Sequence, residues 1–151
     1  MAGVAVLLLL LTACGTSSVE VQPTPVSGAA RRACAALVAD LPARVSDQTR
    51  RRTTGDALAA AWGDPAIVLR CGVGRPAGYT RFATCQRANG LDWFVPDDVA
   101  ADQSKDVVMT TVGRVPAVEV VVPASDRPPV PAMVDLGPTI KSHTRLVRAC
   151  S

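Results

Sequence analysis

The sequence predicts a single small α+β domain, with an antiparallel sheet of about four or five strands, short flanking helices and two disulfides. Short apolar and β-branched runs recur along the chain, and Asn89-Gly90 lies between two of them, as in a two-residue hairpin. Alanine- and leucine-containing segments that end near proline predict the helices. The disulfides are expected because an even set of cysteines remains once Cys14 is set aside.

The N-terminus predicts export and lipid modification. The apolar run of residues 4–11 is far shorter than the roughly 20 residues of a membrane-spanning helix and has the length of a signal-peptide core. It ends in Leu11-Thr12-Ala13-Cys14, the pattern of bacterial lipoprotein signals. The run would hold Cys14 at the membrane surface, where its thiolate takes a diacylglyceryl group. We therefore expect cleavage after residues 1–13, and a protein anchored by lipid to the extracytoplasmic face of the cell membrane.

The rest of the chain predicts a tether and one domain. Residues 14–28 are polar, interrupted by proline and without periodicity, and they predict a flexible tether that spans about 45 Å when extended. Residues 29–151 are long enough for a single modest core. The net charge of +3 is too small to favour a nucleic-acid partner. Because aromatic residues are few, the core has to be built from small aliphatic side chains, and covalent support is expected.

That support is expected from the cysteines. Cys34, Cys71, Cys85 and Cys150 would lie in an oxidising compartment, where disulfides form and persist. Four cysteines allow three pairings, and we predict Cys71–Cys85, on adjacent predicted strands, and Cys34–Cys150, which joins the two ends of the domain. A metal site is not favoured, because no C-x-x-C spacing occurs and His143 is the only histidine. No cofactor is expected.

The first part of the domain predicts a helix and then a loop. Residues 29–40 form a short helix that ends before Leu41-Pro42. Residues 47–55 are interpreted as a loop, whose Arg50-Arg51-Arg52 run would be solvated or touch anionic lipid headgroups. Residues 57–62 are ambiguous between helix and strand.

Residues 66–71 predict a central strand, because the run is apolar and β-branched. Ile67 and Leu69 would share one face of it, and Arg70 would point to the other. The glycine-rich segment 72–78 follows, but its spacing differs from G-x-G-x-x-G and no helix pattern comes after it. We interpret this segment as a flexible connection rather than a nucleotide-binding loop.

Two hairpins are predicted in the second half. Strands 82–86 and 91–95 flank Asn89-Gly90, the preferred pair for a type I′ turn, and strands 106–112 and 117–122 form the second hairpin.

The C-terminal segments predict a helix and a last strand. Residues 132–142 form a weakly amphipathic helix that Gly137-Pro138 interrupts, and residues 143–150 return toward Cys34 as an edge strand. Glu119, an acid inside an apolar strand, is expected to face solvent.

Three blocks of the sequence resemble a known family. They are WGDPAIVLRCGV (62–73), NGLDWF (89–94) and TVGRVPAVEV (111–120). They are similar to an actinobacterial family of small exported lipoproteins that is catalogued only as a domain of unknown function, and the resemblance extends from about Cys34 to Cys150. It implies an envelope protein of a high-GC, Gram-positive-type bacterium. It implies no activity, substrate or catalytic residue.

The chain favours a non-catalytic binding or structural module of the cell envelope. Its expected partners are the membrane, through the lipid, and an unknown envelope protein or cell-wall component. The candidate binding surface comprises Trp93, Phe94, Arg70 and Trp62, because rigid aromatic rings are frequent hot spots and are rare in this chain. Trp93 and Phe94 point to opposite faces of one strand, so that one ring would face away from the helices. Trp62 is better explained as a core residue.

The alternative is a small envelope hydrolase that uses paired loop carboxylates, as in glycoside hydrolysis. A serine–histidine–acid site would need His143, and no G-x-S-x-G motif accompanies it. A cysteine nucleophile would need a thiol outside the disulfides. The candidate carboxylates are Asp92, Asp97, Asp98, Asp102 and Glu119.

Overall fold

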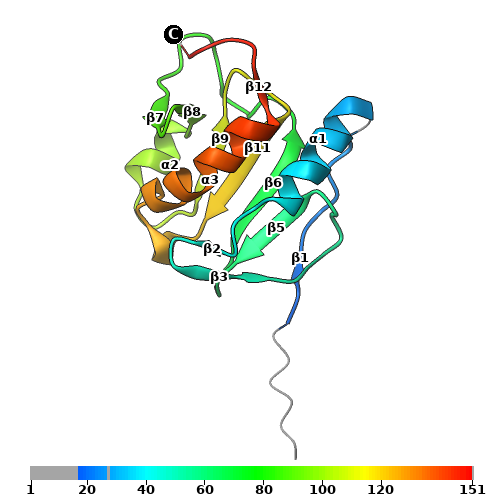
Figure 1. The fold of residues 1–151 in the computed structure, drawn as a ribbon. Helices are drawn as coiled ribbons and strands as arrows, with labels where there is room; N and C mark the ends of the chain where they lie inside the picture. Colours follow the sequence, from blue (N-terminus) through cyan, green and yellow to red (C-terminus); the bar gives the residue numbers. More distant parts are fainter. Residues whose placement is uncertain (1–16, 27, 151) are drawn as a thin grey trace, which may run out of the picture.

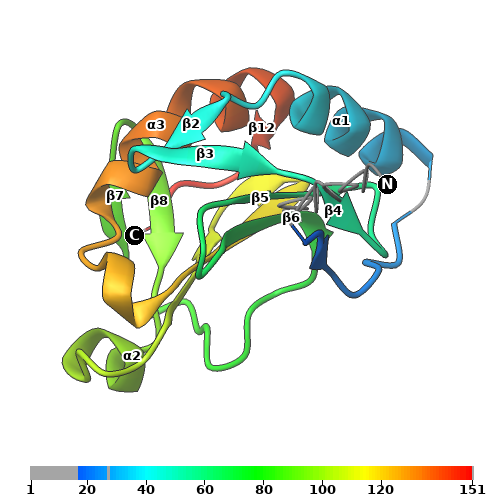
Figure 2. The same cartoon turned by 90° about the horizontal axis from the view of Figure 1, so that it is seen from below.

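Two helices, α1 and α3, lie side by side on one face of a large sheet (Figures 1 and 2). The computed structural model describes residues 17–26 and 28–150, so the predicted signal peptide and Cys14 lie outside the described residues. The elements are β1 (Val19–Glu20), α1 (Gly28–Ala39), β2 (Arg44–Val45), β3 (Gln48–Arg51), β4 (Thr53–Thr54), β5 (Ala59–Trp62), β6 (Ile67–Val73), β7 (Gln86–Ala88), β8 (Leu91–Phe94), α2 (Asp97–Ala101), β9 (Val107–Thr111), β10 (Arg114–Val115), β11 (Ala117–Val122), the 3-10 turn η1 (Ala124–Asp126), α3 (Val130–His143) and β12 (Arg145–Leu146).

The main sheet has eight strands in the order β2-β3-β5-β6-β11-β9-β8-β7, and every neighbouring pair is antiparallel. The strands β6 and β11 form its centre. The central strand predicted at residues 66–71 corresponds to β6. Two small pairs stand apart from it: β1 with β4, and β10 with β12. The predicted antiparallel sheet with flanking helices is thus confirmed, with more strands than expected.

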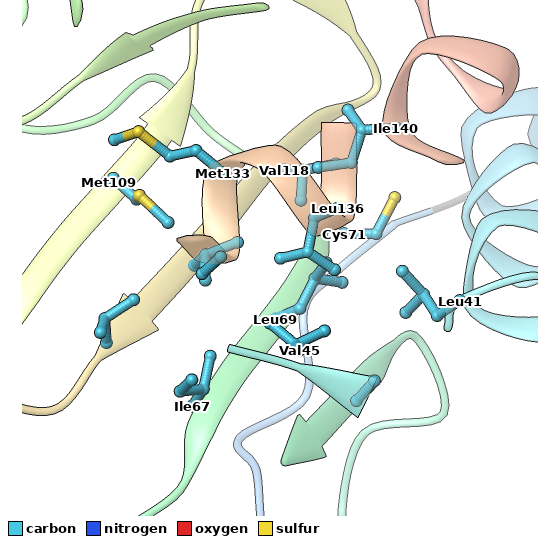
Figure 3. Packing of buried hydrophobic residues seen from close by; sticks show 14 of the residues in the cluster. Leu41, Val45, Ile67, Leu69, Cys71, Met109, Val118, Met133, Leu136 and Ile140 are labelled. Carbon is cyan, nitrogen blue, oxygen red and sulfur yellow. The ribbon is translucent and has the colours of Figure 1, made fainter. Parts of the chain in front are cut away.

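The core lies between the sheet and the two helices. Alternating residues of β6 and β11 point toward the helices, because side chains alternate between the faces of a strand. From α3, Met133, Leu136 and Ile140 follow the three- and four-residue spacing of a helix face and pack against them (Figure 3). The sheet residues of this layer include Ile67, Leu69, Cys71, Val118, Val120 and Val122, all fully buried.

Both predicted hairpins form, but the first strand of the first one is β7, residues 86–88, rather than the predicted 82–86. In the first, Ala88 pairs with Leu91 across Asn89 and Gly90, whose φ angles of 49° and 76° are those of a type I′ turn. In the second, β9 pairs with β11.

The strands that the sequence did not reveal are short and polar. β3 and β7 have mostly exposed side chains and no apolar alternation, because they lie toward the edges of the sheet. As a result, residues 47–55, expected to be a loop, contain β3 and β4. The turn between β2 and β3 is made by Ser46 and Asp47, both with positive φ, without the Asn-Gly signature of a hairpin.

The predicted disulfide pairing is wrong, although all four cysteines form disulfides. Cys34 pairs with Cys71, and Cys85 with Cys150, with Cα–Cα distances of 5.5 and 6.4 Å. The error came from placing Cys71 and Cys85 on adjacent strands. Cys85 instead precedes the edge strand β7, with β11, β9 and β8 between it and β6. Cys71 faces the helix layer, where α1 presents the buried Cys34.

The predicted tether is shorter than expected. Val19 and Val21 donate backbone hydrogen bonds to the carbonyls of Arg52 and Thr54, and the Thr24 amide donates to Asp56. The described chain is therefore attached to the domain from residue 17 onward, because backbone hydrogen bonds and the buried Val21 hold it there. Among the described helices, none is long and apolar enough to cross a membrane.

Candidate functional site

The two tryptophans of the predicted aromatic surface are core residues. Trp62 and Trp93 have no exposed surface, and both belong to the layer between sheet and helices. Trp62 donates its indole N–H to the carbonyl of Pro42 at 3.0 Å. Trp62 is thus a core residue, as its alternative interpretation had it, and Trp93, a candidate for the binding surface, is buried in the same layer, where the two are the largest fully buried side chains among the described residues.

Phe94 and Arg70 do lie on the face of the sheet away from the helices, but neither is free. The Phe94 ring meets Tyr79 edge-on at 5.3 Å and is almost completely covered by the chain after β6. Arg70 pairs with Glu119, directly opposite it on β11, with 3.1 Å between Nε and Oε1. Glu119, expected to face solvent, is therefore largely covered and ion-paired.

A cleft of about 1010 Å³ opens at the end of the sheet where β6 finishes. We call it the sheet-end cleft. Its walls are the glycine-rich segment 72–81, the turn 112–117 between β9 and β11, and the C-terminal segment 147–149. Ligand sites for small molecules commonly have about this volume. The segment 72–78, predicted to be a flexible connection, thus forms one wall of this cleft.

Arginines and aliphatic side chains line the sheet-end cleft. The cationic residues are Arg75, Arg81, Arg114 and Arg148, and no acidic residue is among the described lining residues. Arg75 and Arg81 lie over aromatic rings, at 5.7 Å from the centre of Tyr79 and 4.7 Å from that of Phe82. Val73, Val112, Val115, Pro116 and Val147 form the apolar part of the walls.

Arg114 is a structural member of this set. Its Nε donates to Thr144 Oγ1 at 2.7 Å, and its Nη2 donates to the carbonyls of Lys141 and Thr144. These bonds join β10 to the end of α3, and partial burial lowers the pKa of the Arg114 guanidinium. By contrast, Arg75, Arg81 and Arg148 make no ion pair with any acidic group in the described ranges.

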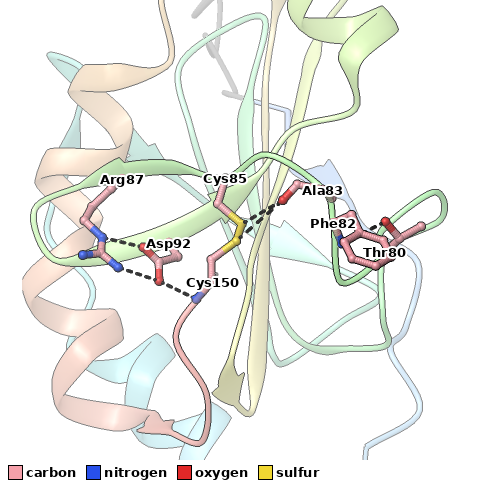
Figure 4. The surroundings of a disulfide bond; sticks show 7 residues. All are labelled: Thr80, Phe82, Ala83, Cys85, Arg87, Asp92 and Cys150. Atoms are coloured by element: carbon pink, nitrogen blue, oxygen red, sulfur yellow. Dashed lines mark hydrogen bonds and ion pairs between the residues drawn. A yellow bond between two sulfur atoms is a disulfide. The ribbon is translucent and has the colours of Figure 1, made fainter.

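The two outer walls of the cleft are fastened together behind it (Figure 4). The Cys85–Cys150 disulfide joins the loop after β6 to the C-terminal segment. Asp92 accepts a hydrogen bond from the Cys150 amide at 3.0 Å and pairs with Arg87 at 2.6 Å. The Arg87 hydrogen bond holds the pKa of the Asp92 carboxyl below its usual value, with the Cys150 bond acting in the same direction. The chain after β6 and the C-terminal segment are therefore linked by a disulfide and by the contacts of Asp92.

Four of the five carboxylates considered for hydrolysis, Asp92, Asp98, Asp102 and Glu119, have structural partners. Asp98 pairs with Lys105, and Asp102 accepts hydrogen bonds from Ser104. These bonds lower the pKa of both carboxyls, as Arg87 does for Asp92. In a site with paired carboxylates, the general acid has a raised pKa and lies beside a second, ionised carboxylate. None of these three carboxyls has a raised pKa.

The remaining candidates for chemistry are also accounted for. His143 lies at the end of α3 and bonds Asp40 at 2.7 Å, which links that helix to the chain after α1. Within residues 17–26 and 28–150, no group of three histidine, cysteine or acidic residues could hold a metal ion. The sheet-end cleft is thus the best-formed candidate site.

Comparison with known proteins identifies the family. A family model described as "Protein of unknown function (DUF3515)" matches residues 1–148. The chain belongs to this family. No curated protein and no solved structure matches it. The described DUF3515 fold therefore has to be interpreted from its own residues.

The sequence offered little signal for the cleft of this DUF3515 protein. Its arginines lie far apart in the chain, at positions 75, 81, 114 and 148, and only the fold brings them together. The usable signal was local: glycines after the central strand and at Gly113 mark places where another segment approaches closely. A side chain at Gly113 would overlap the Arg148 carbonyl, and Gly72 is packed against Val26.

Proposed function

We propose that this chain is a membrane-anchored, non-catalytic binding module of the cell envelope, and that the sheet-end cleft binds an anionic group of its partner. The observation that carries the proposal is the set of three arginines, Arg75, Arg81 and Arg148, which face a cleft without an acidic partner in the described residues. Guanidinium groups match the geometry of carboxylate and phosphate, which makes an oxyanion the fitting ligand.

Membrane attachment is proposed from the N-terminal sequence. The apolar run before Cys14 and the motif that ends in Cys14 support lipid modification and an extracytoplasmic location. Two disulfides agree with an oxidising compartment. Metabolic labelling with a fatty-acid probe tests this directly: the wild-type protein should be labelled and Cys14→Ser should not. An unlabelled wild-type protein would contradict the anchor while leaving the cleft intact as a binding site.

The environments of the acidic residues support the non-catalytic assignment. Asp92, Asp98 and Asp102 have lowered pKa values and structural partners, and the described residues that line the cleft include no acid or histidine. These observations favour a binding module over the hydrolase alternative.

Co-sedimentation with the insoluble envelope fraction of the parent bacterium tests cleft binding. Arg75→Gln combined with Arg148→Gln removes two charges from the cleft, and Arg31→Gln combined with Arg32→Gln removes two exposed charges from α1 as a matched control. The cleft variant should sediment at least several-fold less than wild type, and the control should sediment like wild type. Equal loss in both variants would mean that net charge alone drives association and would overturn the proposal.

A further inference from the structure

We infer that the partner of the sheet-end cleft is a protein segment that combines acidic and apolar side chains, and that the segment approaches from the side away from the membrane. This inference rests on the proposed binding role of the cleft and names its partner class. Three sets of observations carry it: exposed apolar side chains around the cleft, unpaired arginines among them, and the position of the cleft relative to the start of the described chain.

The first observation is an apolar surface at the mouth of the cleft. Val115 and Val147 line the cleft and are 48% and 51% exposed. Leu146 precedes Val147 and lies on the β10–β12 pair, and it is 54% exposed; Phe82, which follows the lining residue Arg81 but does not itself line the cleft, is 81% exposed. Four of the six large hydrophobic side chains that the described chain exposes are thus at this end. Adjacent exposed apolar residues usually mark an interaction site.

The second observation is the chemistry of that surface. Arginine and aromatic side chains are enriched at protein–protein interfaces, whose buried centres are more apolar than their rims. A ligand with only negative charge would leave Val115, Val147 and Phe82 in water, and a purely apolar ligand would leave the arginines without a counter-charge. A segment in which acidic residues alternate with valine, leucine or similar side chains satisfies both, because alternate residues of an extended chain point in opposite directions.

The third observation concerns direction. Arg51 donates to the carbonyls of both Ser17 and Gly63, so the described chain begins beside the turn that leads into β6. β6 then runs 7 residues from Ile67 to Val73, a length of roughly 23 Å, and the cleft opens at its far end. Figure 1 shows β1 and the β12 end of the molecule on opposite sides of the fold.

This direction separates the cleft from the bilayer. Gly15 and Thr16 alone separate Cys14 from Ser17, a span of about 10 Å when extended. With the start of β6 toward the membrane, the cleft lies farther from a lipid on Cys14 than the Debye length of about 8 Å at physiological ionic strength. In that orientation the charge of the headgroups is screened at the cleft, and a partner above the membrane is the favoured occupant.

The test uses the processed, full-length protein in zwitterionic nanodiscs and fluorescent peptides of stated composition. One peptide alternates glutamate with valine and leucine; a second replaces glutamate by glutamine; a third keeps glutamate and replaces the apolar residues by serine. Fluorescence anisotropy measures each affinity. The first peptide should bind at least tenfold more tightly than the other two, and Arg75→Gln with Arg148→Gln should remove that difference, whereas Arg31→Gln with Arg32→Gln should not.

Several results would overturn the inference. Equal affinity for the first and third peptides would indicate a purely polyanionic ligand, and equal affinity for the first and second would exclude charge recognition. Binding of vesicles that contain anionic phospholipid, with no preference among the peptides, would assign the cleft to lipid. If the peptides are not distinguished but Arg75→Gln with Arg148→Gln still abolishes envelope co-sedimentation, the cleft remains a binding site and only the partner class is wrong.

Discussion

At the level of single residues, Asp92 joins its own hairpin to the C-terminal segment, which is distant in sequence. Its carboxylate bonds Arg87 on β7 and the Cys150 amide, from its own place on β8. Asp92 is buried like the other residues of β8. A charged side chain is tolerated there because both of its carboxylate oxygens accept hydrogen bonds. It is thus a positioning residue for the C-terminal wall of the cleft.

Replacement of Asp92 by asparagine should destabilise the fold by about 1–3 kcal/mol at neutral pH, because the Arg87 guanidinium and the partly buried Cys150 amide lose a charged acceptor. The folded-state pKa of Asp92 is below its usual value. Its contribution is therefore complete above the usual aspartate pKa of about 3.9 and is lost as pH falls through the lower, folded-state value. Urea unfolding of wild type and Asp92→Asn should show a difference that shrinks in this acidic range. Asp97→Asn, an exposed change of equal charge, should show almost none.

Gly113 is the second residue on which the cleft depends. Its φ of 71° and the overlap of an added Cβ with the Arg148 carbonyl both require glycine. Gly113→Ala should cost about 1–2 kcal/mol through the backbone angle alone, and more through displacement of segment 147–149. Gly74→Ala is the control, because Gly74 has open space around it and no positive φ. A thermal-unfolding scan in which both variants behave alike would contradict this account.

At the level of elements, the Asn89-Gly90 turn holds α3 as well as its own hairpin. Pro138 lies inside α3 and has no N–H for the carbonyl of Val134, one turn earlier. The Asn89 side chain donates to that carbonyl instead, at 3.2 Å. The proline that was predicted to interrupt the helix is therefore accommodated, and α3 continues to His143.

Two substitutions separate the roles of Asn89. Asn89→Gly keeps a residue that accepts positive φ and should lose only the hydrogen bond, about 0.5–1.5 kcal/mol. Asn89→Ala should lose the bond and also strain the turn, for about 1–2 kcal/mol more. Chemical denaturation gives both values. Equal stability of the two variants would show that the turn conformation contributes nothing.

The two disulfides should differ in consequence. In the chain-entropy model, closures of 37 and 65 residues are each worth about 4 kcal/mol. Cys34 and Cys71 are also fully buried between α1 and β6, whereas Cys85 and Cys150 are partly exposed. The double alanine variant of Cys34 and Cys71 should therefore lose more stability than that of Cys85 and Cys150.

The same comparison has a second readout. The variant without Cys85 and Cys150 should keep the core but release the C-terminal wall of the cleft, and it should lose envelope binding. Non-reducing peptide mapping checks the pairing, and urea unfolding with co-sedimentation checks the rest. A Cys71–Cys85 peptide in the map would contradict the fold as described.

At the level of the whole molecule, the sequence was sufficient wherever one face of an element is buried. The alternation in 66–71 predicted both the strand and its helix-facing side, and Asn89-Gly90 predicted the hairpin. The polar strand β3 was missed, and β7 was placed at residues 82–86 instead of 86–88, because polar strands toward the edges of the sheet carry no apolar pattern. The cysteine pairing failed for a different reason: strand order in the sheet does not follow strand order in the chain.

The candidate site was the part least open to prediction. Trp93 was included because aromatic rings are rare in this chain, but it fills the core, as was expected of Trp62. The arginines of the cleft come from a loop, a turn and the C-terminal segment, and no local pattern relates them. Only tertiary structure shows that they share one cavity.

The most direct test of the central claim is photo-crosslinking in intact cells from two positions. A photoreactive residue at Thr80 sits in the cleft, and one at Ser125, in η1, is exposed elsewhere. The account predicts a discrete adduct from position 80 that is absent from position 125, is lost with Arg75→Gln and Arg148→Gln, and persists with Arg31→Gln and Arg32→Gln. An adduct from position 125 alone, or one from position 80 that survives loss of the cleft arginines, would contradict it.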